Sequence, residues 1–257
     1  MESLKNRIVC ITGASSGIGA ACAVEFARLG ASLLLSARRI ERVEALAQKL
    51  HEQYAVPVHT FQVDVMKHAS VQTALTSLPK EWKAIDILLN NAGLSRGLAP
   101  VQSGSLQDWE EMIDTNIKGV LYMTREILPG MIQRKRGQVI NIGSIAGHQV
   151  YPNGNVYCAT KYFIDALTQG LKMDLLGTGI KVSSVDPGLV ETEFSEVRFR
   201  GDKARAAEVY AKTKPLRPED VADVVIFCAT RPPHVDISDV IVMSTWQASV
   251  THVHRTS

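Results

Sequence analysis

Residues 8–19 of the chain, with the sequence IVCITGASSGIG, decide the fold. The run IVCI is short, apolar and rich in β-branched residues, which predicts a buried strand. The glycines end that strand, and apolar residues then recur at helical spacing from Ile18 to Leu29. A strand, a glycine-rich turn and a helix in this order are the context that a dinucleotide-binding motif requires.

The glycines of this loop are spaced G-x-x-x-G-x-G. Glycine adopts backbone conformations that are closed to other residues and lets the chain approach a pyrophosphate. The helix that follows offers free N–H groups and the positive end of its dipole to the same phosphate. The alternative is an ordinary turn, which the flanking strand and helix disfavour. We therefore predict cofactor contacts from Gly13, Ser15, Ser16, Gly17, Ile18 and Gly19.

The end of the second predicted strand, residues 31–36, bears on the choice of cofactor. NAD-binding proteins usually place an acidic residue there to bond the ribose hydroxyls. This chain has Ala37, Arg38 and Arg39 instead. Two guanidiniums suit a 2′-phosphate, whereas an aspartate would repel it. The alternative, that both arginines open the next helix and face solvent, is disfavoured because helix N-termini prefer anions. We predict NADP(H).

The rest of the chain alternates between helical and strand patterns. Helices are expected at 40–54, 68–78, 106–131, 157–176 and 218–229, and strands at 58–63, 85–89, 138–142, 181–185 and 240–243. This alternation predicts an α/β fold in one domain, residues 1–257, with a parallel sheet of about seven strands and helices on both faces. Residues 189–214 are predicted to be loop-rich and to form a lid over the site.

Polar and small residues fall where these strands end. Ligands of an open α/β sheet bind at the carboxyl ends of its strands. Asp64 is expected to contact the adenine amino group, with helix capping as the alternative. His148 and Tyr151 are expected to be structural or to form pocket walls. The predicted cofactor contacts at the strand ends are Asp64, Val65, Asn91, Ala92, Gly93, Pro187 and Gly188.

Tyr157 and Lys161 lie four residues apart in a predicted helix, so their side chains share one face. Such a pair alone is weak evidence for catalysis. Ser144 precedes the pair at the end of a predicted strand. Asn116 lies in the interior of a predicted helix, where asparagine is unfavourable, which indicates a function or a local kink. Together these four residues predict a catalytic group.

Composition excludes several other classes of protein. The chain has 257 residues, is 46% apolar and carries a net charge of +2, which argues against nucleic acid or a membrane surface as a partner. Its four cysteines lack metal-ligand spacing, and His252 and His254 have nothing nearby to complete a site, so we expect no metal. No apolar run is long enough to span a bilayer, and we expect a cytoplasmic protein with reduced thiols.

These motifs resemble the short-chain dehydrogenase/reductase family along essentially the whole chain. The resemblance implies a doubly wound, Rossmann-like fold, an oxidoreductase and usually a homotetramer. It also implies a tetrad of Asn116, Ser144, Tyr157 and Lys161, in which the last two also contact the cofactor. Val190 and Thr192 are further expected cofactor contacts. The stretches 109–116, 128–131, 151–157 and 193–201 are similar to NADP-dependent 3-hydroxy acid dehydrogenases.

The expected reaction is hydride transfer between nicotinamide and the carbinol carbon of a small 3-hydroxy acid. Tyr157 would act as the base, with its pKa lowered by Lys161, while Ser144 holds the substrate oxygen. Asn116 would fix a water that gives the proton an exit. Arg198 and Arg200 are candidates for binding the substrate carboxylate, although each could simply face solvent. The alternatives are a reductase of larger carbonyls and a non-catalytic NADP sensor.

Overall fold

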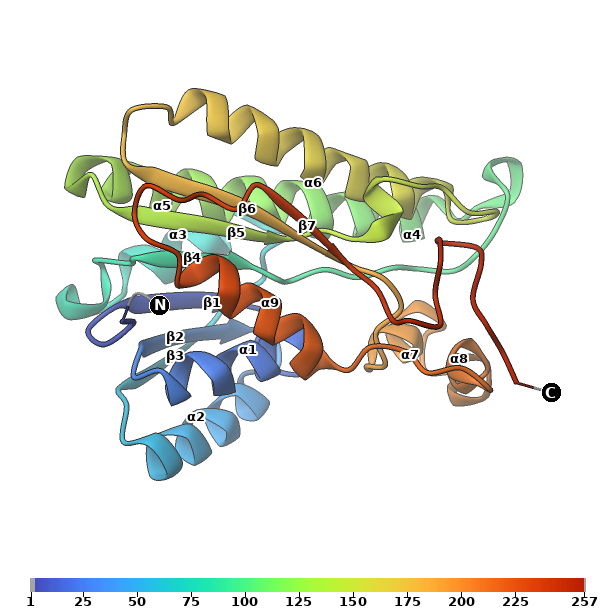
Figure 1. Ribbon diagram of the computed structural model, residues 1–257, viewed down its shortest axis with the longest axis horizontal. Coiled ribbons are helices and arrows are strands. Elements are labelled where there is room, and N and C mark those ends of the chain that lie inside the picture. The colour runs from blue at the N-terminus through green and yellow to red at the C-terminus, as the bar shows by residue number, and fades with distance from the viewer. Residues whose placement is uncertain (1–2, 257) are drawn as a thin grey trace.

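A computed structural model describes residues 3–256 of the chain. Its centre is one sheet of seven parallel strands in the order β3-β2-β1-β4-β5-β6-β7 (Figure 1). Because the chain starts in the middle of the sheet and builds outward in both directions, the strand order reverses beside β1, as in doubly wound folds. The strands are β1 (Ile8–Thr12), β2 (Ser32–Ala37), β3 (Val58–Gln62), β4 (Ile87–Asn90), β5 (Gly137–Ile142), β6 (Ile180–Pro187) and β7 (Asp239–Val242).

Helices cover both faces of this sheet. One face is packed against α1 (Gly17–Arg28), α2 (Ile40–Tyr54) and α9 (Pro218–Ala229). The other is packed against α3 (His68–Thr76), α5 (Gly119–Arg134) and α6 (Asn155–Asp174). The remaining helices are α4 (Leu106–Ile113), α7 (Phe194–Arg198) and α8 (Lys203–Tyr210), and short 3₁₀ turns occupy Lys80–Trp82, Val101–Ser103 and Ile145–Gly147.

The buried strands explain why each face has its own core. In β1, Val9 and Ile11 belong to the cluster under α1 and α9, while Cys10 between them belongs to the cluster under α5. Successive side chains of a strand point to opposite faces, so a continuous apolar run serves both cores. The predicted fold class is therefore confirmed, together with α2 and α9 at their predicted bounds.

Two segments differ from the expectation. The long helix predicted for 106–131 is three pieces, because a π-helical turn, Asp114–Lys118, separates α4 from α5. The lid is more ordered than a loop-rich segment, since it carries α7 and α8, and Asp202 caps α8 by accepting a hydrogen bond from the Arg205 N–H. Its weak periodicity reflects how short these two helices are.

Two further features concern membrane-spanning helices and the cysteines. Within residues 3–256, no helix combines the length and the apolar character needed to cross a bilayer. All four cysteines are unpaired thiols in the interior of the protein.

Candidate active site

A cavity of about 1100 Å³ opens at the carboxyl ends of the strands. Its walls come from the glycine-rich loop, the ends of β2, β3, β4, β5 and β6, the start of α6 and the lid. Nearly all the predicted cofactor and substrate residues line it. Of the predicted cofactor and substrate residues, Gly19 alone does not line it, and of the predicted tetrad Asn116 alone does not. The topology thus brings together residues that are far apart in the sequence.

The loop after β1 is shaped to hold a phosphate group. Gly13 has a φ of +68°, and a Cβ there would lie 2.9 Å from the Cα of Ala92, so only glycine fits. Asn91 fixes the loop from the neighbouring strand end, because its Nδ2 donates to the carbonyls of Thr12 (2.8 Å) and Gly13 (3.1 Å). Helix α1 begins at Gly17 without a side-chain cap, which leaves its first N–H groups available to an anion.

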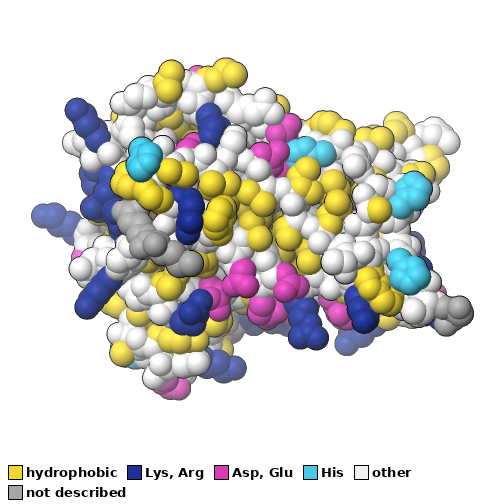
Figure 2. All heavy atoms as spheres, viewed as in Figure 1, with side chains coloured by type: hydrophobic (Ala, Val, Ile, Leu, Met, Phe, Trp, Pro, Cys, Tyr) yellow, Lys and Arg dark blue, Asp and Glu magenta, His cyan; other side chains and the backbone are white. Residues whose placement is uncertain are grey.

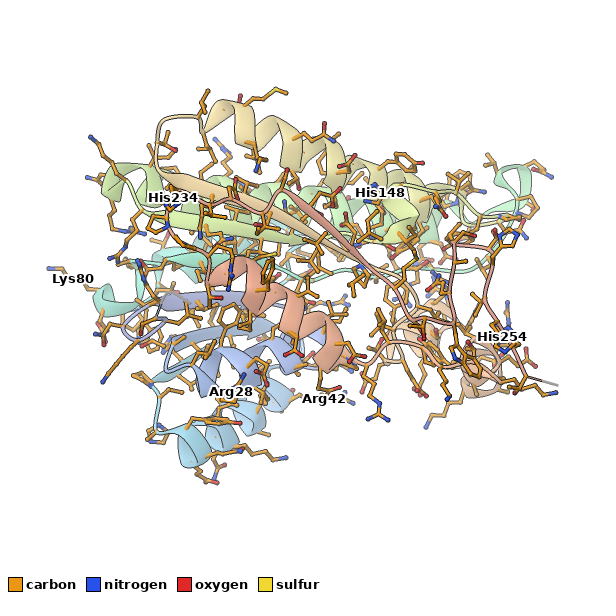
Figure 3. All side chains as sticks on the ribbon, in the orientation of Figure 1. Arg28, Arg42, Lys80, His148, His234 and His254 are labelled. Atoms are coloured by element: carbon orange, nitrogen blue, oxygen red, sulfur yellow. The ribbon has the colours of Figure 1, made fainter. Side chains whose placement is uncertain are left out.

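The arginines after β2 form a cationic end of this cavity. Arg39 Nη2 donates to the hydroxyls of Ser15 (3.2 Å) and Ser16 (3.1 Å), which joins the second strand's end to the phosphate loop. The guanidinium of Arg38 is exposed and has no hydrogen bond or ion pair with any residue in the described range. Arg42, one turn further along α2 and labelled in Figure 3, lines the same wall. The sequence interpretation missed Arg42, which helical spacing from Arg38 could have suggested.

The predicted residues at the ends of β3, β4 and β6 also line the cavity. Asp64 and Val65 line the cavity beyond β3, and Asp64 Oδ1 also accepts a hydrogen bond from the N–H of Met66 at 3.2 Å. The contact to Met66 lies in the turn before α3, whose N-cap residue is Lys67 and has no side-chain cap, so Asp64 is not the helix cap of the alternative interpretation. Asn91, Ala92 and Gly93 line it beyond β4. Pro187, Gly188, Val190 and Thr192 line it at the start of the lid.

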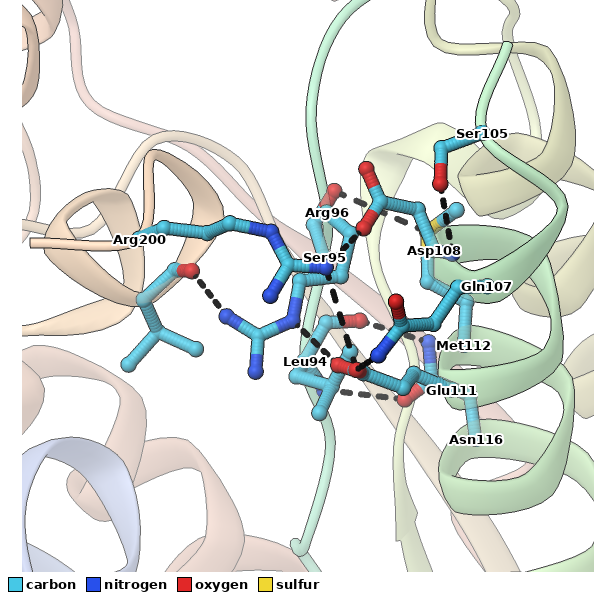
Figure 4. Close-up of polar contacts among 11 residues, drawn as sticks. Leu94, Ser95, Arg96, Ser105, Gln107, Asp108, Glu111, Met112, Asn116 and Arg200 are labelled. Carbon is cyan, nitrogen blue, oxygen red and sulfur yellow. Dashed lines mark hydrogen bonds and ion pairs between the residues drawn. The ribbon is translucent and has the colours of Figure 1, made fainter.

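Asn116 lies in the π-helical turn, which accounts for an asparagine in a helix interior. Its Nδ2 donates to the carbonyl of Leu94 (2.8 Å) and to Thr160 Oγ1 (3.1 Å), and its Oδ1 accepts from the Leu94 N–H (2.9 Å). Figure 4 shows the paired contacts with Leu94. The side chain therefore joins the segment after β4 to helix α6. Its suggested role in fixing a water stays a prediction.

Ser144, Tyr157 and Lys161 meet at the floor of the cavity, where all three are buried. Ser144 lies two residues after β5, and its Oγ accepts a hydrogen bond from the Ala146 N–H at 3.1 Å, which fixes the hydroxyl. Lys161 lies one turn after Tyr157, with its Nζ 6.0 Å from the Tyr157 ring centroid. That Nζ donates to the carbonyl of Ile142 at 2.9 Å. These hydrogen bonds fix the Ser144 hydroxyl and the Lys161 ammonium beside the Tyr157 ring.

The electrostatics of this group correct one expectation. Burial raises the pKa of Tyr157 well above its usual value, and the opposing effects come from Arg198 and from a hydrogen bond with Ser144. Burial also lowers the pKa of Lys161 to about 8, although the charge of Asp186 raises it. Lys161 is directed to the Ile142 carbonyl rather than to the phenol, so it does not lower the pKa of Tyr157 as predicted. The resting side chain is a neutral phenol.

The two lid arginines have different surroundings. Arg198 Nη2 donates to the hydroxyl of Tyr151 at 3.0 Å, and its guanidinium carbon lies 5.4 Å from the Tyr157 ring centroid. The Nε of Arg198 is buried and has no hydrogen-bond partner among the described residues. Arg200 instead pairs with Asp108 and lies 3.8 Å from Glu111 (Figure 4). Of the two lid arginines, Arg198 is therefore the one beside Tyr157, and Tyr151 is a pocket wall as predicted.

The lid is held by contacts that the sequence interpretation missed. Arg96, after β4, bonds Glu111 on α4 (2.6 Å) and donates to the carbonyl of Val197 on α7 (Figure 4). At the base of the lid, Gln247 Oε1 accepts from the Leu189 N–H at 2.7 Å. The C-terminal segment is polar in sequence, yet Gln247, Val250, Val253 and Arg255 line the cavity. No periodicity marks these residues, so only the folded chain reveals them.

A second polar cluster lies behind the floor. His148 Nε2 is 2.7 Å from Asp186 Oδ2, and Ser184 Oγ donates to Asp186 Oδ1 at 2.6 Å. Burial lowers the pKa of His148, but the hydrogen bond and charge of Asp186 outweigh it, so the pKa of His148 is raised. His148 (labelled in Figure 3) is thus held by Asp186 and does not line the cavity.

This geometry agrees with comparisons to known proteins. A family model for short chain dehydrogenases matches residues 7–203 of the chain. The chain belongs to the short-chain dehydrogenase/reductase family. The resemblance noted in the sequence is thereby confirmed. The assignment of Asn116, Ser144, Tyr157 and Lys161 as a catalytic tetrad stays a prediction.

Individual members of the family are similar over almost their whole length. The chain is 46% identical over 250 residues to an NADP-dependent 3-hydroxy acid dehydrogenase of Salmonella typhi, which covers 96% of this chain and 99% of that protein. It is 45% identical over 242 residues to sulfoacetaldehyde reductase 2 of Chromohalobacter salexigens, covering 94% and 95%. The closed form of a serine dehydrogenase complexed with NADP⁺ superposes with a TM-score of 0.90 at 44% identity, covering 97% and 100%.

Proposed function

We propose that this family member is an NADP-dependent oxidoreductase that interconverts a small 3-hydroxy acid, such as serine or 3-hydroxypropionate, with its 3-oxo acid or semialdehyde. The observation that carries the proposal is Arg198, whose guanidinium lies 5.4 Å from the Tyr157 ring centroid within the cavity. A cation beside the catalytic phenol suits a substrate with an anionic group close to its reacting carbon. The relatives named for 3-hydroxy acids, serine and sulfoacetaldehyde support this class.

The cavity fits the expected cofactor. The missing side chain at Gly13 leaves space for a pyrophosphate, and the uncapped start of α1 offers it N–H donors. The guanidinium of Arg38, which has no partner among the described residues, suits a 2′-phosphate. Gly188, Val190 and Thr192 line the wall between the lid and the catalytic floor. Bound NADP(H) would supply the hydride or accept it at its nicotinamide ring.

The neutral phenol supports Tyr157 as the proton donor of the proposed reaction. In the reductive direction Tyr157 donates its proton to the carbonyl oxygen as negative charge develops there, and Ser144 donates a hydrogen bond to the same oxygen. Arg198 and the hydrogen bond from Ser144 stabilise the resulting phenolate, because both favour the charged form of Tyr157. Lys161 would hold the nicotinamide ribose. In the oxidative direction the phenolate removes the alcohol proton. Arg198 orients the substrate by its anionic group.

The proposal is tested by a substrate panel with paired lid variants. Serine, 3-hydroxypropionate and 3-hydroxyisobutyrate are compared with sulfoacetaldehyde, an uncharged primary alcohol and steroid and acyl-carrier controls, by following NADPH absorbance. Replacing Arg198 with Leu should raise KM for the hydroxy acids about 10- to 100-fold and spare the uncharged alcohol, because a charge-assisted hydrogen bond is lost.

The matched control is Arg200→Leu, which removes an arginine of the same lid that is paired with Asp108. Its KM values should stay within about threefold of wild type. Equal losses on charged and uncharged substrates in the Arg198 variant would contradict a carboxylate clamp. Preference for steroid or acyl-carrier substrates would favour the reductase of larger carbonyls instead.

We also propose that the enzyme is a cytoplasmic homotetramer. Its four buried, unpaired cysteines suit a reducing compartment. Large apolar side chains remain exposed on α5 and α6, and a second exposed set lies on α9 and β7, so two faces could be covered by other copies of the chain.

A further inference from the structure

One acidic residue of the lid reaches the arginines at the opposite wall of the cavity. Glu193 immediately precedes α7, and its Oε2 accepts from Arg39 Nη1 at 3.0 Å while its Oε1 accepts from Arg42 Nη1 at 2.7 Å. Arg39 and Arg42 lie at the start of α2, more than 150 positions away in the chain. Both oxygens of the carboxylate are therefore engaged across the cavity, and the lid is joined to α2.

These contacts place a negative charge in the cationic end of the cavity. Burial acts to raise the pKa of Glu193, but the hydrogen bonds from Arg42 and Arg39 outweigh it and lower that pKa, so the carboxylate is ionised at neutral pH. Two of the three guanidiniums there are thus paired with Glu193, and Arg38 is left without a partner in the described chain.

We infer that Glu193 is a specificity-determining residue that competes with the 2′-phosphate of NADP(H) for Arg39 and Arg42. The inference rests on the proposed assignment of Arg38 and Arg39 to that phosphate. A phosphate monoester carries close to two negative charges at neutral pH, so it repels the carboxylate and attracts the same guanidiniums. NAD(H) has a hydroxyl at this position and does not displace Glu193. The carboxylate therefore weakens NADP(H) selectively and lowers the preference for it.

The competition also links the cofactor to the lid. While Glu193 holds Arg39 and Arg42, the start of α7 is joined to α2. When the 2′-phosphate takes these arginines, that connection is released, and the segment with Arg198 is free to adjust to the substrate. An adenine nucleotide without a 2′-phosphate leaves the connection intact.

The direct test is Glu193→Gln, with binding of NADPH, NADH and adenosine 2′,5′-bisphosphate followed by fluorescence titration at low and high salt. We expect Kd for NADPH and for the bisphosphate to fall about two- to fivefold at low salt, because exposed ion pairs contribute only modestly. Kd for NADH should not change. The gain should shrink at high salt, where such charges are screened.

The matched control is Glu191→Gln, which removes an exposed lid carboxylate that does not line the cavity and should leave all three Kd values unchanged. Unchanged or weaker NADPH binding in Glu193→Gln would overturn the competition, and weaker binding would mean that Glu193 instead fastens the lid over the cofactor. Arg38→Ala separates the two proposals. If it leaves the NADPH to NADH ratio of Kd unchanged, the 2′-phosphate assignment itself fails. If the ratio collapses while Glu193→Gln has no effect, only the competition fails.

Discussion

At the scale of single residues, the pKa shifts of Tyr157 and Lys161 differ from the expectation that Lys161 lowers the pKa of the phenol. Burial keeps the phenol protonated and makes the ammonium easier to deprotonate. Lys161 is fixed by the Ile142 carbonyl and by the field of Asp186, so its position does not depend on the tyrosine. Burial therefore favours the protonated form of Tyr157, which is the form that the proposed reduction needs as a proton donor.

Replacing Tyr157 with Phe removes that proton and leaves the ring in place. We expect kcat to fall by about 10²- to 10⁴-fold, the usual contribution of a general acid or base. NADPH should still bind within about twofold, because the phosphate contacts lie at the other end of the cavity. Steady-state rates and NADPH fluorescence check this, and a near-normal kcat would contradict the assignment.

Lys161→Met tests the cost of burying the ammonium. The pKa of Lys161 falls from its usual 10.5 to about 8 in the folded protein, so between these values the unfolded chain binds more protons and stability rises with pH. At pH 7 the buried charge is fully present and destabilising. The variant should therefore be more stable than wild type by about 1–3 kcal/mol at pH 7, after the loss of one hydrogen bond, and inactive.

Thermal unfolding of both proteins from neutral to alkaline pH measures this difference. The advantage of the variant should shrink as pH rises from about 8 towards 10.5, because wild-type Lys161 then becomes neutral. A variant that is less stable than wild type at every pH would show that the ammonium contributes more through its contacts than its burial costs.

At the scale of elements, the lid is positioned by segments from three parts of the chain. Arg96 binds Val197 from the β4 side, Glu193 reaches α2, and Gln247 holds the lid's first residues from the C-terminal side. Gln247 is buried, and its Oε1 takes the N–H of Leu189. A buried N–H that loses its partner costs more than the bond itself contributes.

We therefore expect Gln247→Leu to lower the free energy of unfolding by about 1–3 kcal/mol. The loss should be local, so amide exchange at the start of the lid should accelerate more than exchange in β1. Gln169→Leu is the control, since within residues 3–256 the Gln169 side chain bonds only Asp165, on the exposed side of α6. Equal stability of the two variants would contradict a role for the C-terminal segment in holding the lid.

At the scale of the whole molecule, the sheet brings the site residues together at one edge, and apolar side chains remain exposed elsewhere on the surface. Met173 is 77% exposed near the end of α6, and Tyr162 on the same helix is 42% exposed. Figure 2 shows a second gathering of apolar side chains across the middle of its view, over β7 and α9, where Phe227 and Ile241 are exposed. A closed tetramer needs two different self-complementary faces, and these two surfaces suit that need.

The double variant Tyr162→Asp, Met173→Glu places charges on the α6 face. If a tetramer forms through both faces, light scattering should show it reduced to dimers, because like charges would meet across a two-fold axis. Lys80→Glu, at a distant exposed turn labelled in Figure 3, should leave the mass unchanged. A wild-type monomer, or a variant of unchanged mass, would contradict assembly through α6.

Much of this protein was determined by the sequence alone. Local patterns predicted the alternation of strands and helices, because the spacing of apolar side chains and the positions of glycines can be recognised within a few neighbouring residues. The ends of parallel strands lie at one edge, so the sequence alone could assign the cofactor loop, Arg38, Ser144, Tyr157 and Lys161 to one site. The asparagine among apolar residues indicated an irregularity of the helix at Asn116, but it did not predict a π-helical turn.

Tertiary structure alone decided the features that depend on burial and on distant contacts. The protonated state of Tyr157 follows from how deeply it is enclosed, and the different surroundings of Arg198 and Arg200 follow from where α4 and Tyr151 lie beside the lid. The pairing of Glu193 with Arg39 and Arg42 joins residues more than 150 positions apart. A sequence gives the identity of each charge, but the distance between two charges, which sets their interaction, exists only in the folded chain.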